Sequence, residues 1–198
     1  MISDKFVIIG ALAELWGCII YSRDTLTGKT KPNRVTWLLW FLAPSVAFAA
    51  ELNKHVSFYI ALTTLSVVAG PMLVFAASFF SPQAYWKLGR LDYTCGLLSL
   101  LGLLLWVIYK DSNIALVFAL VADFLAAAPT LVKSFTNPET ESLEAYTAAI
   151  LNGGLALLAI KHWTLANYGF PAYIFMINIV FVLFIHYELG LKLQSKKA

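Results

Sequence analysis

The sequence predicts an all-α integral membrane protein with seven transmembrane helices. Two properties of its composition, the residue content and the mean hydropathy, point to this fold class. Of the 198 residues, 60% are hydrophobic and only 13% are charged, and the mean hydropathy is +0.76. A soluble domain of this size cannot bury so much apolar surface, so most of that surface is expected to face lipid. The third observation is that the chain divides into apolar runs of about 20 residues, the length that a helix needs to cross a bilayer.

Seven such runs follow one another with short connections. They cover residues 5–22, 35–51, 57–80, 92–110, 113–135, 144–161 and 168–190. The runs use nearly the whole chain, so no soluble domain is expected. The first run is not expected to be a cleaved signal peptide, because Glu14 interrupts its apolar core and no small-residue cleavage pattern precedes Arg23.

The charge distribution predicts an outside N-terminus and a cytoplasmic C-terminus. With seven crossings, the loops after the first, third and fifth runs lie on the same side as the C-terminus. That side carries ten of the 14 Lys and Arg residues: Arg23, Lys29, Lys31, Arg34, Lys87, Arg90, Lys133, Lys192, Lys196 and Lys197. The other side carries Lys5, Lys54, Lys110 and Lys161. Because positive residues in short loops stay in the cytoplasm, this asymmetry sets the orientation. Short loops and the absence of a targeting extension favour a bacterial plasma membrane.

The sequence pattern also predicts two copies of one three-helix unit. Equivalent positions in the two copies are Pro32 and Pro138, Trp40 and Tyr146, Glu14 and Asp123, and the dipeptides Lys54–His55 and Lys161–His162. The predicted division is a first repeat at 1–91, a linker helix at 92–111 and a second repeat at 112–198 with a short basic tail. Three helices is an odd number, so a single linker helix is needed to give both copies the same orientation, which is a known transporter plan.

Two acids lie at mid-membrane depth in equivalent places. Glu14 and Asp123 are each the only acid deep in their run. An ionisable group near the bilayer centre is costly, so it usually faces a cavity or a partner. Such a pair could bind a cation, hold a proton or hydrogen-bond a polar solute, and burial beside a like charge would favour the protonated form. The alternative is that each acid is neutral and bonded to a neighbouring helix.

Aromatic and amide side chains supply the other candidate binding residues. Trp37, Trp40 and Tyr146 lie just inside their helices, where they could stack on a sugar, a base or a cation or anchor the helix at the interface. Asn152 and Asn178 are amides at mid-membrane depth, and the alternative for each is an interhelical hydrogen bond worth about 1 kcal/mol. The remaining tryptophans are predicted to be packing or interfacial residues: Trp16, Trp86, Trp106 and Trp163.

The segment APTLVKSFTNPETES, residues 128–142, resembles the PQ-loop pattern of a proline late in a helix, a basic residue, and a serine at the next helix. Together with the 3+1+3 arrangement and the outside N-terminus, it makes the chain similar to the SWEET sugar-transporter and PQ-loop superfamily. The chain departs from the pattern at Thr130, where the motif has Gln, and at Cys18 to Tyr21, where the first repeat has no proline.

This resemblance implies a transporter that moves a small polar solute, with sugar as the expected class, by alternating access. It implies hinges at Pro44 and Pro129 within helices, with Gly153–Gly154 standing in the sixth run. It also implies a sugar-gripping role for Asn178, for which the first repeat offers only Thr64 or Ser66. The repeated turns at Pro32 and Pro138 would then be cytoplasmic elbows, and the Glu14 and Asp123 pair favours proton coupling.

Other functions stay open on the sequence alone. Trp37-Leu-Leu-Trp40 is similar to the WxxW of nicotinamide riboside transporters, although those carry it in a later helix. A cation channel that uses Glu14 and Asp123 for selectivity is another alternative, and so is a non-transporting receptor or assembly protein. Apart from the bilayer and the small solute no partner is predicted, nucleic acid included, although a homo-oligomer is compatible with the sequence.

Several kinds of chemistry are not expected. There is no phosphate-binding glycine loop, no HExxH helix, and no lysine between Ala172 and His186 for a retinal Schiff base. No nucleophile–base pair stands out, so an enzyme is not predicted. Cys18 and Cys95 lie inside helices and are predicted to be packing residues, so neither a metal site nor a cofactor is expected.

Overall fold

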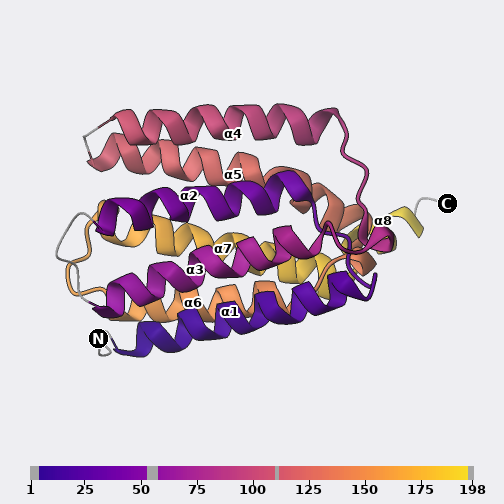
Figure 1. Ribbon diagram of the computed structural model, residues 1–198, viewed down its shortest axis with the longest axis horizontal. Coiled ribbons are helices and arrows are strands. Elements are labelled where there is room, and N and C mark those ends of the chain that lie inside the picture. Colours follow the sequence, from indigo (N-terminus) through magenta and orange to yellow (C-terminus); the bar gives the residue numbers. More distant parts are fainter. Residues whose placement is uncertain (1–4, 53–57, 110–111, 196–198) are drawn as a thin grey trace.

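The computed structural model describes residues 5–52, 58–109 and 112–195, and all regular elements in those ranges are helices. The seven long helices lie side by side along the length of the molecule (Figure 1). They are α1 (Lys5–Leu26), α2 (Arg34–Leu52), α3 (Phe58–Ala77), α4 (Arg90–Ile108), α5 (Ser112–Thr136), α6 (Leu143–Ala159) and α7 (Leu165–Tyr187). Three short helices complete the chain: η1 (Pro82–Ala84), η2 (Pro138–Thr140) and α8 (Leu189–Ser195).

Four helices in the described part of the chain are long and apolar enough to cross a membrane. These segments are Phe6–Leu26 of α1, Arg90–Ile108 of α4, Leu116–Thr136 of α5 and Asn167–Tyr187 of α7. Shorter apolar helices cover Thr64–Ala77 and Leu143–Ala159. The structure is therefore consistent with a membrane protein, and a crossing by α2, α3 or α6 stays a prediction.

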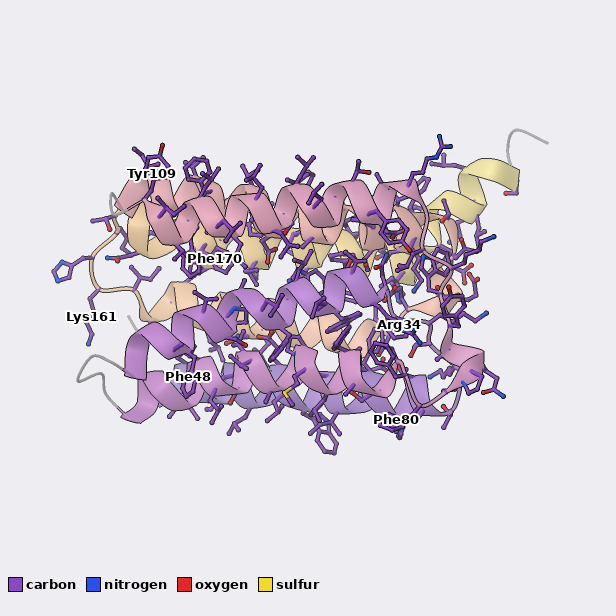
Figure 2. All side chains as sticks on the ribbon, turned by 45° about the horizontal axis from the view of Figure 1, so that its top comes forward. Arg34, Phe48, Phe80, Tyr109, Lys161 and Phe170 are labelled. Atoms are coloured by element: carbon purple, nitrogen blue, oxygen red, sulfur yellow. The ribbon has the colours of Figure 1, made fainter. Side chains whose placement is uncertain are left out.

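The outer surface of the bundle is apolar along much of its length. On α1, a single face exposes Phe6, Ile9, Leu12, Trp16 and Ile19, which recur at the spacing of one side of a helix. Figure 2 shows large side chains such as Tyr109 on the outside, whereas Arg34 and Lys161 lie near opposite ends of the bundle. A surface of this kind suits contact with lipid better than contact with water.

The helices pack in an order that differs from their order in the sequence. Helix α3 contacts both α1 and α2, and α7 contacts both α5 and α6. Helix α1 also packs along α6, and α4 packs along α5. The α1–α6 approach depends on a glycine: a Cβ on Gly17 would lie 2.9 Å from the Cβ of Ala148 and 3.0 Å from the Cα of Ala145. Small residues allow such close helix contacts in membranes.

Each of the seven predicted apolar runs falls on one long helix, but several predicted ends were wrong. Helix α1 continues to Leu26, and α3 stops at Ala77 because the amides of Phe79 and Phe80 bond three residues back in a tight turn. Helix α7 stops at Tyr187 because Glu188 has a left-handed backbone with φ of 49°. The predicted Lys54–His55 dipeptide and Lys110, Lys196 and Lys197 lie outside the described residues.

The turn before α2 is held by Asn33. Its Oδ1 accepts hydrogen bonds from the backbone N–H groups of Val35 at 3.1 Å and Thr36 at 3.3 Å, which caps the start of the helix. Its Nδ2 donates to Asp92 at the start of α4. Pro32, directly before, is fully buried. The entry to α2 is therefore fixed against α4 as well as within its own turn.

Candidate functional site

A cavity of about 550 Å³ lies in the interior of the bundle. Its size is within the range of pockets that take small molecules, about 300–1,000 Å³. Residues from α1, α2, α3, α4, α5, α6 and α7 line it: Glu14, Cys18, Trp37, Leu39, Trp40, Ala43, Pro44, Val67, Pro71, Ser99, Leu103, Trp106, Leu116, Ala119, Ala122, Asp123, Ala126, Ala145, Tyr146, Ala149, Phe170, Ile174, Ile177 and Asn178. Most of these side chains are apolar, so the few polar groups decide which solute could fit.

Both predicted mid-depth acids line this cavity. Glu14 on α1 accepts a hydrogen bond from Asn152 Nδ2 on α6. Asp123 on α5 accepts one from the hydroxyl of Tyr173 on α7, with 2.8 Å between the oxygens. Each acid is thus oriented by a donor on a neighbouring helix, and both line the same cavity.

An aromatic cluster lies beside the cavity. The ring of Trp37 is 4.9 Å from that of Tyr21 and 5.2 Å from that of Trp40. Phe181 lies 6.0 Å from Trp40 and stacks on Tyr146 at 4.4 Å, so it joins the two aromatics that the repeat pattern had paired. Trp37 is only 3% exposed, which argues against the interfacial-anchor interpretation of this residue.

The hydroxyl groups of the two tyrosines in this cluster bind the same carboxylate. The hydroxyls of Tyr21 and Tyr146 both donate to Glu141 Oε2, at 2.8 Å and 2.7 Å. The other carboxylate oxygen of Glu141 forms an ion pair with Lys133 Nζ at 2.5 Å. The side chains of Lys133 and Glu141 are 1% and 0% exposed, so this is a fully buried ion pair.

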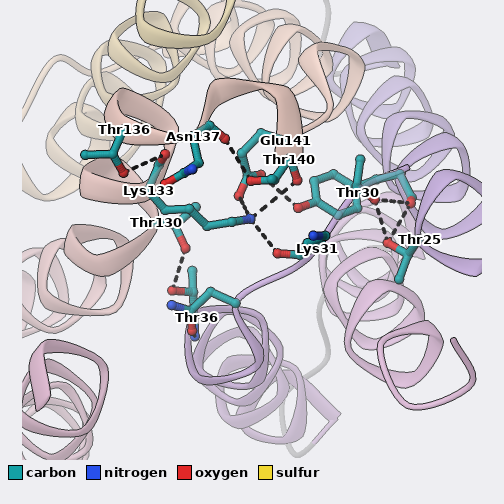
Figure 3. Close-up of polar contacts among 12 residues, drawn as sticks. Thr25, Thr30, Lys31, Thr36, Thr130, Lys133, Thr136, Asn137, Thr140 and Glu141 are labelled. Carbon is teal, nitrogen blue, oxygen red and sulfur yellow. Dashed lines mark hydrogen bonds and ion pairs between the residues drawn. The ribbon is translucent and has the colours of Figure 1, made fainter. Parts of the chain in front are cut away.

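Lys133 uses all three of its N–H donors. Besides Glu141, its Nζ donates to the backbone carbonyls of Lys31 and, at 3.4 Å, Thr140 (Figure 3). Its ammonium also lies 4.9 Å from the ring centroid of Trp86, within cation–π range. A buried charge needs this degree of satisfaction, because an unpaired ammonium in a dry interior is strongly destabilising.

Further bonds join the same two turns. The backbone N–H of Lys31 donates to the carbonyl of Thr140 at 2.9 Å. Deeper in the bundle, the Thr36 hydroxyl donates to the Ala126 carbonyl at 2.7 Å and accepts from the Thr130 hydroxyl at 2.8 Å. We call this set the proline-turn network: Tyr21, Lys31, Thr36, Ala126, Thr130, Lys133, Thr140, Glu141 and Tyr146. It connects α1, α2 and their turn to α5, α6 and theirs.

Lys133, which is counted above among the positive residues of the cytoplasmic side, is not a solvated charge. It lies inside α5 and is buried, because Glu141 and the two turn carbonyls replace water around its ammonium. Two predictions were too narrow. Cys18, predicted to be a packing residue, is buried and also lines the cavity, and so does Trp106.

The structure brings together about half of the predicted binding and hinge residues. Those that line the cavity are Glu14, Trp37, Trp40, Pro44, Asp123, Tyr146 and Asn178. Asn178 Nδ2 donates to the Ile174 carbonyl in its own helix at 2.8 Å, so that hydrogen is already used.

The other predicted residues lie outside the cavity lining. Asn152 orients Glu14 instead, and Thr64 and Ser66 lie in α3. Pro129 lies within α5, whereas Pro32 and Pro138 lie in the two turns. Gly153 and Gly154 pack against Phe175 of α7, and their role as a hinge stays a prediction.

Sequence reasoning missed Tyr21, Phe181, Tyr173 and the Lys133–Glu141 pair. One signal was available for the pair: a lysine within the last turns of an apolar run is costly unless an acid neutralises it, and Glu141 follows across the proline turn. No sequence pattern indicated Tyr21 or Phe181, whose partners are far away along the chain.

Comparison with family models, curated proteins and solved structures returned no match for the chain. The resemblance to the SWEET and PQ-loop superfamily therefore stays a prediction from the sequence pattern.

Proposed function

We propose that this protein is a seven-helix membrane transporter that moves a small solute through its interior cavity by alternating access. In this proposal α1–α3 and α5–α7 are two halves that rock against one another, and α4 links them. The observation that carries the proposal is that the cavity lies next to the proline-turn network, whose hydrogen bonds connect the two halves. A solute site of this kind needs a barrier that can open, and bonds between moving parts are suited to that role.

The helix contacts support the two-half arrangement. In each triple, the third helix packs between the first and the second: α3 contacts α1 and α2, and α7 contacts α5 and α6. Glu14 and Asp123 occupy the first helix of their triples and both line the cavity. Equivalent packing in two sequence segments is what a duplicated three-helix unit would produce.

The proline-turn network supports a closed gate at one end. Tyr21 and Trp37 from the first half meet Tyr146 and Glu141 from the second half, all of them buried. In this proposal the gate faces the cytoplasm, because the loops at that end carry the excess of positive residues that favours the inside. Opening would separate Lys133 from the Lys31 carbonyl and Tyr21 from Glu141, while the Lys133–Glu141 pair stays within the second half.

Cys18 offers a direct test. It lines the cavity, and Cys95 is the one other cysteine of the chain. In a Cys95→Ser background, a membrane-impermeant methanethiosulfonate reagent would be added to whole cells and, separately, to inverted membrane vesicles. A Cys18→Ser, Cys95→Ser variant controls for labelling elsewhere.

A carrier predicts reciprocal access. Replacement Glu141→Gln weakens the gate, so labelling of Cys18 should rise from the cytoplasmic side and fall from the outer side. A channel predicts that labelling rises from one side without falling from the other, together with ion currents. A receptor with a closed centre predicts labelling that Glu141→Gln does not redistribute, and this outcome would refute the carrier.

A further inference from the structure

We propose that the cavity takes a small organic cation, that is, a substituted ammonium group carried on an apolar or aromatic body. Its role as transported cargo rests on the proposed function, but its binding does not. The inference replaces the sugar that the sequence resemblance implies with a different chemical class. It follows from the charge, the hydrogen-bonding balance and the aromatic content of the lining.

The charged side chains of the described cavity lining are both acidic. Among the described residues that line the cavity are two acids, Glu14 and Asp123, and no lysine, arginine or histidine. A carboxylate offers about four acceptor sites. Glu14 accepts a hydrogen bond from Asn152, and Asp123 accepts from Tyr173 and Trp40. Both acids therefore keep acceptor capacity for a bound cation or an N–H donor.

The hydroxyl donors of the lining and one of the two N–H donors of Asn178 are already engaged with the protein. Ser99 donates to the Ala122 carbonyl at 2.7 Å, Tyr146 to Glu141, and Asn178 to the Ile174 carbonyl. A sugar presents many hydroxyls, each of which donates and accepts, and burying an unmatched one is costly. This cavity offers acceptors in excess of donors, so it is poorly matched to a sugar.

Aromatic rings supply the rest of the recognition. Trp37, Trp40, Trp106, Tyr146 and Phe170 all line the cavity. Aromatic faces attract cations within about 6 Å of the ring centroid, and cages of such rings bind quaternary ammonium groups. The surrounding leucine, alanine and isoleucine side chains suit an apolar ligand body.

Two buried side-chain polar atoms have no hydrogen-bond partner in the described part of the chain, Trp37 Nε1 and Ser134 Oγ, and of these two only Trp37 belongs to the cavity lining. A ligand with a single hydroxyl or carbonyl oxygen could satisfy the indole N–H of Trp37. The ligand chemistry is therefore an ammonium group, an apolar or aromatic body, and few acceptor atoms.

The test is isothermal titration calorimetry on the purified full-length protein in detergent. The probes are choline, benzyltrimethylammonium, glucose and 3,3-dimethyl-1-butanol, which has the shape and hydroxyl of choline without its charge. We expect both ammonium probes to bind and the neutral alcohol to bind at least about tenfold more weakly, because it lacks the charge that the acids attract.

The variants Glu14→Gln and Asp123→Asn remove the charge but keep a carbonyl oxygen for the donors Asn152 and Tyr173. Each is expected to weaken binding of benzyltrimethylammonium by at least about tenfold. Glu139→Gln is the matched control, because Glu139 is exposed and lies outside the cavity lining. It should leave binding unchanged. If either cavity variant fails to fold, the comparison of choline with its neutral analogue on the wild-type protein still decides.

The outcomes separate this inference from the proposed function. Equal binding of choline and the neutral alcohol, glucose binding in place of the ammonium probes, or no binding of any probe would overturn the cation inference. Reciprocal labelling of Cys18 would leave the carrier standing in each of those cases. Binding of the ammonium probes without reciprocal labelling would instead support the cation site and refute the carrier.

Discussion

The hydroxyls of Tyr21 and Tyr146 donate to the same carboxylate oxygen, Glu141 Oε2, at 2.8 Å and 2.7 Å. The two tyrosines come from α1 and α6, and the acid comes from the turn before α6. Because Lys133 occupies the other oxygen, the carboxylate holds three side chains from three different parts of the chain. Stability measurements on variants can show how much each of these contacts contributes to the free energy of unfolding.

Replacing Glu141 with Gln should destabilise the protein by about 3–5 kcal/mol, because it leaves the buried ammonium of Lys133 without its counter-ion. The free energy of unfolding in detergent, followed by circular dichroism with added denaturant, measures the change. Glu139→Gln is the exposed control and should change little.

The same ion pair predicts a compensating double variant. Lys133→Met together with Glu141→Gln removes both charges, so part of the lost stability should return. A double variant no more stable than Glu141→Gln alone would show that the cost does not arise from the unpaired charge.

Each of Tyr21→Phe and Tyr146→Phe should cost about 1.5–3 kcal/mol, the range for a hydrogen bond to a charged group. Phenylalanine keeps the ring contacts to Trp37 and Phe181, so the loss reports the hydroxyl. Because both bonds end on one oxygen, the double variant should depart from the sum of the single ones. Thermal denaturation of all four proteins gives this comparison, and strict additivity would contradict the shared-oxygen geometry. Tyr93→Phe, at an exposed site, is the control.

Thr36→Val should destabilise the contact between α2 and α5 by about 1–3 kcal/mol. It removes the bond to the Ala126 carbonyl and leaves the Thr130 hydroxyl without its acceptor. Thr36→Ser retains the hydroxyl and should recover most of the loss in the same unfolding assay. Thr94→Val, whose hydroxyl bonds only within its own helix at an exposed site, should be close to neutral. Equal loss in the Ser and Val variants would point to the methyl group rather than the hydroxyl.

Gly17→Ala should destabilise the packing of α1 on α6 by about 1–3 kcal/mol, because the new Cβ would lie 3.0 Å from the Cα of Ala145 and the carbonyl oxygen of Glu144. Gly154→Ala is the matched control. Its Cβ would meet only the Phe175 ring at 3.4 Å, and alanine favours the helix, so it should be neutral or stabilising. Melting temperatures of the two variants give the comparison, and a loss at Gly154 as large as at Gly17 would contradict this packing.

Helix positions were predictable because the apolar runs carry their own signal. In lipid every backbone polar group must be satisfied internally, so a long apolar run has little choice but to form a helix. The ends were harder to place. The left-handed Glu188 that stops α7 and the tight turn after Ala77 depend on local backbone geometry that no apolar pattern records.

The candidate site was predictable only in part. Glu14 and Asp123 stood out because a charge deep in an apolar run is costly wherever the run packs, and both line the cavity. For Asn152 the sequence left two possibilities open, a solute contact or an interhelical hydrogen bond, and in the structure it donates to Glu14 on another helix. A polar side chain at mid-depth needs a partner, and the sequence does not say whether that partner is a ligand or another helix.

The sequence by itself determined the helical class, the apolar surface and the two acids at mid-membrane depth, because these follow from composition and from hydrogen bonding within a single helix. The tertiary structure alone decided that Lys133 is buried against Glu141 and that Tyr21 and Tyr146 donate to the same carboxylate. It also decided that the two proline turns are hydrogen-bonded to one another. Those contacts link residues far apart in the chain. Which distant groups become neighbours depends on how whole helices pack, and close packing of side chains sets that arrangement.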